Sequence, residues 1–422
     1  MTSFDHPTLT TAARASACPG LMRIVPARDG GLARLRLPGG VLGAHAARAV
    51  ARAARECGSG VIEVTNRANL QLRGIRDDAH VSLVHIALDA GLGPATPAGD
   101  DLRNVMLSPL ASDDTRALAA DIIASMQADA ALHALSPKFA LQLDGGERLA
   151  MPDHPHDLWL SSIDDGARFA FGLAGTMRQR ASGAIAREEL LPFVSGVLRR
   201  FLALALPDEH RMRDLLARIG IARFLESFAF DADVNTWQRE PTDASLRLGA
   251  HEEPHRATWY AGAQTRLGRL DADTLDSLAD LADTHAEGHL TMTPWQSVLI
   301  PGIALEDTQE VLRRLRALGL ATDPRDPLAR LIACAGSEGC AKSHADTKAD
   351  ALRLAPLLPS HDMNQVHLSG CERSCAAAHP VPVTLYAVAP GRYDLHRDER
   401  TVARNLTLEE AAERVARSHA DV

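Results

Sequence analysis

The stretch V-T-N-R-A-N-L-Q-L-R-G-I, residues 64–75, has a counterpart in M-T-P-W-Q-S-V-L-I-P-G-I, residues 292–303. The two align without a gap and share a threonine and a Gly-Ile pair at matching positions. Around each copy the sequence predicts the same order of strand, helix, strand, strand and helix. Three identities in twelve positions are weak evidence alone. Together with the shared order they indicate an internal duplication.

The predicted elements of both copies follow from alternation in the strands and from helical periodicity between them. In the first copy they are a strand at Leu32–Leu37, a helix at Val41–Cys57, strands at Val61–Val64 and Asn69–Arg73, and a helix at Asp77–Ala90. In the second copy they are a strand at Thr265–Leu270, a helix at Asp271–Ala286, and strands at His289–Met292 and Gln296–Ile300. Each copy therefore predicts a small domain of one sheet and its helices.

Each small domain is followed by a second predicted unit. In the first half, residues 100–110 lead into a helix from Thr115 to about Gln127 and then into the strand F-A-L-Q-L-D-G. In the second half, L-A-R-L-I-A-C-A-G leads into a helix around Asp346–Leu354 and then into V-H-L-S-G-C. If the halves are related, Ser108 takes the place of Cys334. The segment Arg187–Phe230 reads as a helical connector between the halves.

Composition and charge exclude several classes of protein. The net charge of −9 over 422 residues argues against a general nucleic-acid binder. No stretch approaches 18 uninterrupted apolar residues, which excludes a membrane span. Met1–Arg14 lacks the apolar run of a signal peptide. We therefore expect a cytoplasmic protein with reduced cysteines and with no nucleic-acid or membrane partner.

Four cysteines near the C-terminus form a C-x5-C pair and a C-x3-C pair with thirty residues between them, namely Cys334, Cys340, Cys371 and Cys375. Four thiolates in two short, glycine-flanked loops suit a 4Fe-4S cubane, in which each iron takes one cysteine. Zinc sites usually separate the two cysteines of a pair by two to four residues, so zinc suits the second pair only. The third interpretation is that the four cysteines are structural thiols. Cys18 and Cys57 lie outside the quartet, and we expect Cys57 to be a small buried residue.

The cysteine pattern behind a duplicated half domain resembles the sulfite and nitrite reductases, which couple a 4Fe-4S cluster to sirohaem. The stretches A-C-P-G-L-M-R-I-V-P-A-R-D-G-G-L-A-R-L-R-L-P-G-G and I-E-V-T-N-R-A-N-L-Q-L-R-G resemble more closely the precorrin-3B synthase family of the same superfamily. The likeness runs from Ala17 to about Arg397. It implies an α+β, internally duplicated fold, in which two ferredoxin-like half domains form a pseudo-dimer beside two larger α/β domains.

The expected domains are the half domains at residues 17–95 and 244–322, the α/β domains at 100–185 and 325–418, and the helical connector at 186–243. The second α/β domain is expected to hold the iron–sulfur cluster, because all four cysteines of the quartet fall within it.

The resemblance implies an oxidoreductase of aerobic cobalamin biosynthesis, a monooxygenase. Precorrin-3A would be hydroxylated at C-20, with formation of a lactone, using dioxygen and electrons that originate from NADH. The family likeness implies a 4Fe-4S cluster and a further, non-haem iron. No G-x-G-x-x-G follows a predicted strand, so a separate reductase or ferredoxin is expected to deliver the electrons. The alternatives are a sirohaem-dependent sulfite or nitrite reductase, and a non-catalytic iron–sulfur or zinc module.

The resemblance also implies a set of residues that would bind the acidic tetrapyrrole. They are Arg67, Asn69, Gln71 and Arg73, expected to alternate onto one face of a strand, together with Arg103 and Lys138. Two positions depart from the reductase pattern, since Ala140 stands where a second lysine is usual and Trp295 is the counterpart of Arg67. Cys375 matches the cysteine that bridges cluster and haem iron in the reductases, and it is therefore the expected catalytic residue. None of the 18 histidines is assigned as an iron ligand.

Overall fold

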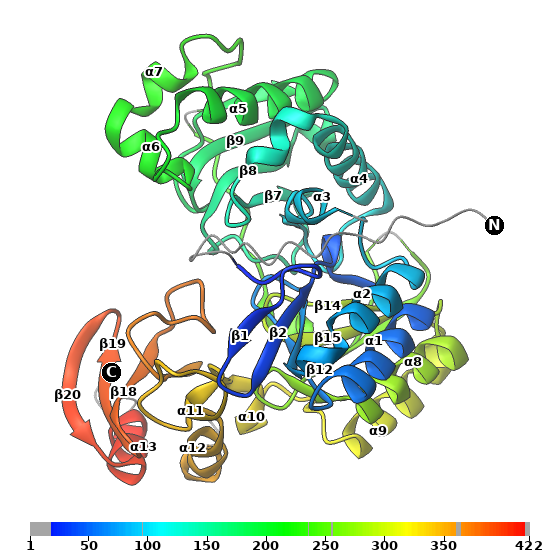
Figure 1. The fold of residues 1–422 in the computed structure, drawn as a ribbon, viewed down its shortest axis with the longest axis vertical. Coiled ribbons are helices and arrows are strands. Elements are labelled where there is room, and N and C mark those ends of the chain that lie inside the picture. The colour runs from blue at the N-terminus through cyan, green and yellow to red at the C-terminus, as the bar shows by residue number, and fades with distance from the viewer. Residues whose placement is uncertain (1–17, 95, 235, 255, 360–363, 418–422) are drawn as a thin grey trace. The chain divides into compact units, whose positions relative to one another are not determined.

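The computed structural model describes residues 18–417 except for 95, 235, 255 and 360–363. The expected domain edges at 17, 95 and 418 lie outside these described residues. The chain divides into two compact units. The first comprises the described part of Met1–Val25 with Ala33–Val41 and Val84–Ala244, and the second comprises Pro26–Leu32, Leu42–Leu83 and the described part of Ser245–Val422. Figure 1 gives the element labels used below.

Two five-stranded sheets carry the duplicated small domains. The first has the order β1 (Val25–Ala27), β2 (Gly30–Leu35), β5 (Leu70–Ile75), β4 (Val61–Val64) and β13 (Arg269–Asp271). The second has the order β11 (Gly249–Glu252), β12 (Trp259–Gln264), β15 (Ser297–Ile303), β14 (His289–Met292) and β3 (Val41–Gly43). The last strand of each sheet comes from the other copy. The two half domains thus exchange an edge strand, and the predicted pseudo-dimer is confirmed.

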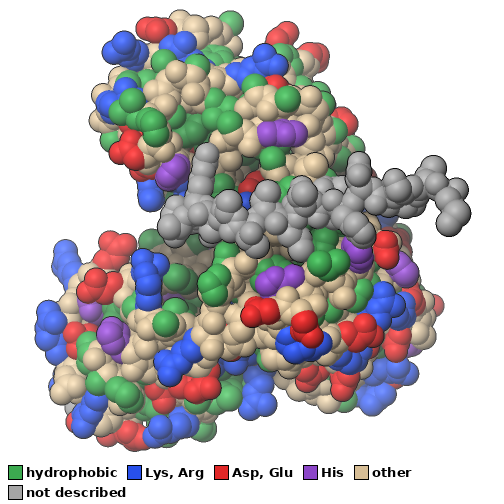
Figure 2. Space-filling view, in the orientation of Figure 1, with side chains coloured by type: hydrophobic (Ala, Val, Ile, Leu, Met, Phe, Trp, Pro, Cys, Tyr) green, Lys and Arg blue, Asp and Glu red, His purple; other side chains and the backbone are tan. Residues whose placement is uncertain are grey.

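The long helices of the two half domains pack against each other. Helix α1 (Ala44–Cys57) buries Ala47, Val50 and Ala54, and α8 (Ala272–His285) buries Leu275, Ala279 and Ala282. Exposed ion pairs join Arg48 of α1 to Asp280 and Asp283 of α8. Figure 2 shows acidic and basic side chains interspersed over the region of α1, α8 and α9 (Thr308–Ala317). Helix α2 (His80–Asp89) is the counterpart of α9 in chain order.

The turns that join the two central strands of each half domain have the same hydrogen bonds. The Thr65 amide donates to the Asn69 carbonyl, and the Thr293 amide donates to the Ser297 carbonyl, at 2.8 and 2.9 Å. Ala68 and its counterpart Gln296 both have a positive φ, of 56° and 60°. The alignment that placed Trp295 opposite Arg67 is therefore confirmed by the backbone.

This turn corrects one expectation. Strand β5 begins only at Leu70, and Arg67 and Asn69 lie in the turn before it. The predicted alternation of four polar residues on one strand therefore holds only for Gln71 and Arg73. The reason is the left-handed conformation at Ala68, which reverses the chain where an extended strand would continue.

Two further five-stranded sheets form the larger α/β domains. The first, in unit 1, contains β6 (Val105–Met106), β7 (Leu141–Asp144), β8 (His156–Ile163), β9 (Arg168–Gly175) and β10 (Gly183–Ala186) in sequential order. The second, in unit 2, contains β16 (Leu331–Ala333), β17 (Val366–Ser369), β18 (Val383–Ala389), β19 (Arg392–Arg397) and β20 (Arg400–Leu406) in the same order. In both, two parallel pairings are followed by antiparallel ones.

The pairing registers of these two sheets match residue by residue. Val105 pairs with Leu141 as Leu331 pairs with Val366. Ser108 lies three residues after Val105, and Cys334 lies three residues after Leu331. Ser108 therefore corresponds to Cys334, as the sequence predicts. The second α/β domain is therefore a structural copy of the first, and the first lacks this cysteine.

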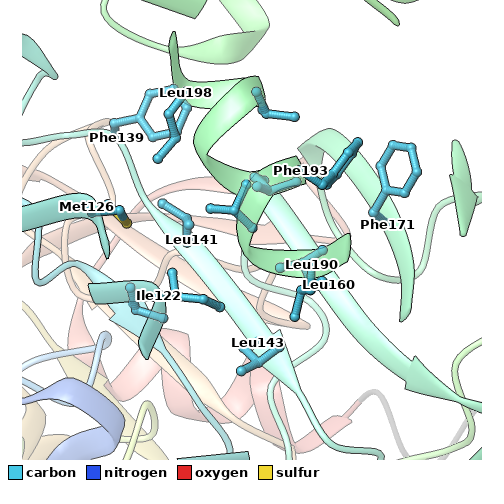
Figure 3. Close-up of a cluster of buried hydrophobic side chains, with 14 of the residues drawn as sticks. Ile122, Met126, Phe139, Leu141, Leu143, Leu160, Phe171, Leu190, Phe193 and Leu198 are labelled. Atoms are coloured by element: carbon cyan, nitrogen blue, oxygen red, sulfur yellow. The ribbon is translucent and has the colours of Figure 1, made fainter. Parts of the chain in front are cut away.

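The core of the first α/β domain corrects the view of residues 186–243 as a separate connector. Helices α4 (Asp113–Ala128) and α5 (Leu190–Leu204) cover one sheet face, where Leu141, Phe171 and Phe193 pack together in Figure 3. Helices α6 (Met212–Ile219) and α7 (Ile221–Leu225) add buried side chains to the same cluster. Burial of these apolar faces, at roughly 25 cal/mol per Å², makes the segment part of the domain.

The core of the second α/β domain lies between its sheet and helices α12 (Thr347–Leu354) and α13 (Leu408–Arg417). Short helices α3 (Pro97–Asp101), α10 (Pro327–Arg330) and α11 (Gly336–Gly339) complete the described elements of that type. The predicted strand at Thr265–Leu270 is wrong, because residues 265–268 turn between β12 and β13 and Leu267 has a φ of 55°. No helix in the described residues has the length and apolar character needed to cross a membrane.

Candidate functional site

The four cysteines of the quartet lie on two loops at one edge of the second α/β sheet. Cys334 directly follows β16, and Cys371 follows the end of β17 by two residues. These strands are parallel neighbours, with Ala333 paired to Leu368, so both loops leave the sheet on the same side. Cys340 ends the first loop after α11, and Cys375 lies in the second loop and is exposed. The fold therefore brings together the two pairs that are thirty residues apart in sequence.

The cysteine sulfurs influence one another electrostatically. Protein atoms around the Cys375 thiol raise its pKa, and the neighbouring thiolates of Cys371, Cys334 and Cys340 raise it further. The amide N–H of Gly370 donates to the Cys334 sulfur at 3.2 Å. Such N–H···S bonds stabilise the negative charge of a metal-bound thiolate. The first cysteine loop therefore has one bond of this kind, at Cys334.

The arrangement suits a cluster better than a single metal ion. A tetrathiolate zinc site brings four sulfurs to about 2.3 Å from one ion. Within the described part of the chain, no three His, Cys, Asp or Glu side chains are grouped closely enough to hold one ion. A cubane separates its cysteines more widely, because each cysteine binds a different iron. Cys334, Cys340, Cys371 and Cys375 are the residues that would hold it.

Arg73, predicted to bind the tetrapyrrole, is instead committed to protein groups. Its side chain is 3% exposed and donates to Asp29 at 2.7 and 2.9 Å and to Glu63 at 3.2 Å. A further N–H donates to the Gly339 carbonyl at 2.8 Å, one residue before Cys340. Four of its five N–H groups donate to protein acceptors, which leaves the side chain poorly placed to bind a ligand carboxylate. It anchors the first cysteine loop.

Glu63 lies at the centre of a buried ion network that sequence reasoning did not identify. Burial alone would raise the pKa of its carboxyl, but Lys348, Arg73 and Arg269 hold that pKa below its ordinary value. Arg269 lies 3.0 Å and Lys348 3.8 Å from the carboxylate. The available signal was the single acid in the apolar strand V-I-E-V, because a buried carboxylate requires cationic partners.

The turn that carries Arg67 contacts the second cysteine loop through Asn66, the residue before Arg67. The Asn66 side-chain amide donates to the Cys375 carbonyl at 3.2 Å. Arg67 and Gln71 are half-buried and Asn69 is buried. The structure therefore brings this turn and the cysteine quartet into one region of unit 2.

The other two residues predicted to bind the tetrapyrrole, Arg103 and Lys138, belong to unit 1. Arg103 donates to the Leu92 carbonyl at 3.1 Å and lies 3.6 Å from Asp100, and burial lowers the pKa of its guanidinium. Lys138 is half-buried in the turn before β7, where its amide donates to the Ser136 hydroxyl. Each remains a prediction as a ligand residue.

The open face of the second α/β sheet lines a cavity of about 1060 Å³. His367, Thr384 and Tyr386 contribute from the strands, and Cys371 and Ser374 contribute from the second cysteine loop. His367 is 1% exposed, and burial lowers the pKa of its imidazole to about 4. Sequence reasoning assigned His367 no role, because a lone histidine in a strand carries no specific signal.

Family models match both kinds of domain. The model of the nitrite/sulfite reductase ferredoxin-like half domain matches residues 25–89 and 251–318, so both predicted copies are found. The model of the nitrite and sulphite reductase 4Fe-4S domain matches residues 98–234. That matched region contains no cysteine. The cysteines that could hold a cluster are therefore those of the second α/β domain, its structural copy.

Several curated proteins are similar over most of the chain. A precorrin-3B synthase from Sinorhizobium sp is 27% identical over 389 residues, which cover 90% of this chain and 82% of that protein. The chloroplastic ferredoxin–nitrite reductase of Arabidopsis thaliana is 26% identical, over 81% of this chain and 64% of that protein. This chain thus spans just under two thirds of the plant reductase.

The fold also agrees with a solved structure, that of the Mycobacterium tuberculosis NirA protein. The TM-score is 0.76 at 21% identity, over 93% of this chain and 80% of that one. The four sheets of the structure agree with the domains that the family models match, namely both half domains and the first α/β domain. The chain belongs to the nitrite and sulfite reductase superfamily, with a similarity to precorrin-3B synthase that extends over most of its length.

Proposed function

We propose that this protein is an iron–sulfur monooxygenase that converts precorrin-3A to precorrin-3B. One atom of dioxygen would be inserted at C-20 of the macrocycle, a ring acetate would close a lactone, and the second oxygen atom would leave as water. Two electrons, originating from NADH, complete the balance. In this proposal the 4Fe-4S cluster, when bound, would supply them singly from a separate reductase or ferredoxin. The described residues offer no ligand set for a further mononuclear iron, so no step is assigned to one.

The observation that carries the proposal is the joint placement of four cysteines on the parallel strand ends of the second α/β domain. The extent of similarity supports this reaction, since the chain covers 82% of a precorrin-3B synthase, compared with 64% of a plant and 73% of a cyanobacterial nitrite reductase. The oxidoreductase relatives support an enzyme.

The residues around the quartet suit a substrate that enters and leaves. A precorrin carries several carboxylates, which arginine forks bind through paired hydrogen bonds. Arg67 lies in the turn whose Asn66 side chain donates to the Cys375 carbonyl. The Arg73 guanidinium binds Asp29 and Glu63. Trp295 replaces the pseudo-symmetric arginine. Fewer carboxylate contacts favour release of the product over permanent retention of a prosthetic group.

Cys375 is the proposed catalytic cysteine, because it is the exposed member of the quartet. We predict that Cys375→Ser lowers the turnover of precorrin-3A at least tenfold. The dissociation constant of precorrin-3A should change less than threefold. Anaerobically reconstituted enzyme, assayed by single-turnover product formation and by equilibrium binding, tests this expectation. Unchanged turnover would exclude the assigned role.

A sirohaem-dependent nitrite or sulfite reductase is the second candidate, because the nitrite reductases match at nearly the same identity as the synthase. Anaerobic purification, iron and sulfide analysis and a visible spectrum separate the two. The proposed synthase predicts broad iron–sulfur absorption and oxygen-dependent conversion of precorrin-3A. Strong sirohaem bands with reduction of nitrite or sulfite would select the reductase. A colourless protein containing zinc would contradict both.

A further inference from the structure

The ion network around Glu63 contacts the first cysteine loop at two points that the proposed reaction does not use. We propose that Arg73 and Lys348 are positioning residues, which fix the loop Cys334–Cys340 to the half-domain sheet and raise the reduction potential of the cluster bound there. The inference rests on the proposed iron–sulfur function, and its two parts are tested separately below.

Arg73 shapes the loop at the peptide before Cys340. Its guanidinium donates to the Gly339 carbonyl at 2.8 Å while Asp29 and Glu63 fix its orientation. A Cβ atom added at Gly339 would collide with this guanidinium. A larger residue at position 339 would therefore displace the arginine from its bonds, and the φ of Gly339, which is not positive, gives no separate reason for glycine.

Lys348 performs the same task at the peptide before Cys334. Its ammonium donates to the Ala333 carbonyl at 3.2 Å and to the Leu267 carbonyl at 2.6 Å. Lys348 is 7% exposed, and Glu63 lies 3.8 Å from its ammonium. Both cysteines of the first pair therefore follow a carbonyl that is held by a buried cation.

The network carries an excess of positive charge. Asp29 and Glu63 supply two negative charges, whereas Arg73, Arg269 and Lys348 supply three positive ones. Reduction makes a cluster more negative by one charge, so nearby cations stabilise the reduced state. Because the group is buried, solvent screens this effect less than it screens a surface pair.

The second half domain shows that the fold itself does not need these ions. In the aligned strands Pro301 stands at the position of Arg73, and Thr291 stands at the position of Glu63. The turn and the strand pairing are otherwise the same. The charges occur in the half domain whose arginine reaches a cysteine loop, which indicates a role tied to that loop.

The test uses the full chain with Lys348→Met and Arg73→Lys, and with Arg48→Ala as a control at an exposed ion pair. A redox titration of the reconstituted cluster, followed by electron paramagnetic resonance, gives the midpoint potential. Hydrogen exchange of residues 334–340 in the cluster-free chain measures positioning alone.

We expect Lys348→Met to lower the ratio of reduced to oxidised cluster at least tenfold at a fixed potential, about 59 mV for one electron. Arg73→Lys keeps the positive charge but loses the several N–H donors of the guanidinium. Amide hydrogen exchange in residues 334–340 should therefore rise at least fivefold, and the midpoint potential should change less than in Lys348→Met. An unchanged midpoint overturns the electrostatic role, and unchanged exchange overturns the positioning role. A wild-type chain that binds no iron overturns the proposed function and the electrostatic role together.

Discussion

The buried histidine of the second α/β sheet predicts a local loss of stability in mild acid. His367 lies on β17, and burial followed by the neighbouring His379 lowers the pKa of its imidazole from 6.5 to about 4. In the unfolded chain the ring regains its ordinary pKa. Below pH 6.5 the unfolded state therefore binds more protons than the folded state, and stability falls as the pH falls towards 4.

The expected size follows from the difference between the two pKa values. The difference between a pKa of 6.5 and one of about 4 corresponds to roughly 3 kcal/mol of stability when it is fully expressed. Between pH 7.5 and pH 5 the part that is lost is about 2 kcal/mol. Gln142 occupies the corresponding position in the first α/β sheet, since it pairs with Met106 as His367 pairs with Ile332. His367→Gln is therefore a substitution that the same sheet already accommodates.

The assay is hydrogen exchange by mass spectrometry at pH 7.5 and pH 5, corrected for the intrinsic exchange rate. The opening free energy of residues 366–369 should fall by about 2 kcal/mol in the wild type. His367→Gln should remove most of that fall, whereas the exposed control His133→Gln should leave it unchanged. Residues 141–144 of the first sheet serve as an internal reference. If the acid-induced loss persists in His367→Gln, another group is responsible and the reasoning is wrong.

Two further substitutions test buried contacts, one between Arg73 and the first cysteine loop and one inside the first α/β domain. Gly339→Ala places a Cβ atom against the Arg73 guanidinium, so we expect a loss of about 1–3 kcal/mol and a lower iron content, whereas Gly43→Ala, which meets no atom within 4 Å, should retain normal iron. Asp144→Asn disrupts a buried pair with Arg239, whose bonds are 2.6 and 2.9 Å, and should cost about 3–5 kcal/mol in urea unfolding. Asp153→Asn at the exposed pair with Arg178 should cost less than about 1 kcal/mol, and equal losses in the two variants would contradict the argument from burial.

Much of the fold could be predicted from the sequence because the duplication repeats a local signal. The two aligned stretches share a turn whose hydrogen bonds coincide, and the order of the elements around them is the same. The exchange of β3 and β13 between the copies could not be predicted, because strands of three residues carry little periodicity. Pairing of edge strands depends on tertiary contacts that a single sequence does not display.

The site was predicted in part, for reasons that differ from residue to residue. The spacing of the four cysteines predicts that they hold a cluster, and two parallel strands bring their loops to one edge of the sheet. The sequence predicts a ligand-binding role for Arg73 because residue type alone does not show which partner a guanidinium takes. Asp29 and Glu63, which occupy that guanidinium, come from other parts of the first half domain. Only the folded structure reveals this competition between internal and external anions.

The two copies contribute different parts of the proposed cysteine site. The cysteine loops belong to the second half of the chain, but Asn66 and Arg73, which hold their carbonyls, belong to the first. The sheet that carries these two residues is itself completed by β13 from the second half. Each copy therefore supplies a strand or a side chain that the other lacks. Such mutual dependence favours retention of both copies, even though the first α/β domain has Ser108 where the second has a cysteine.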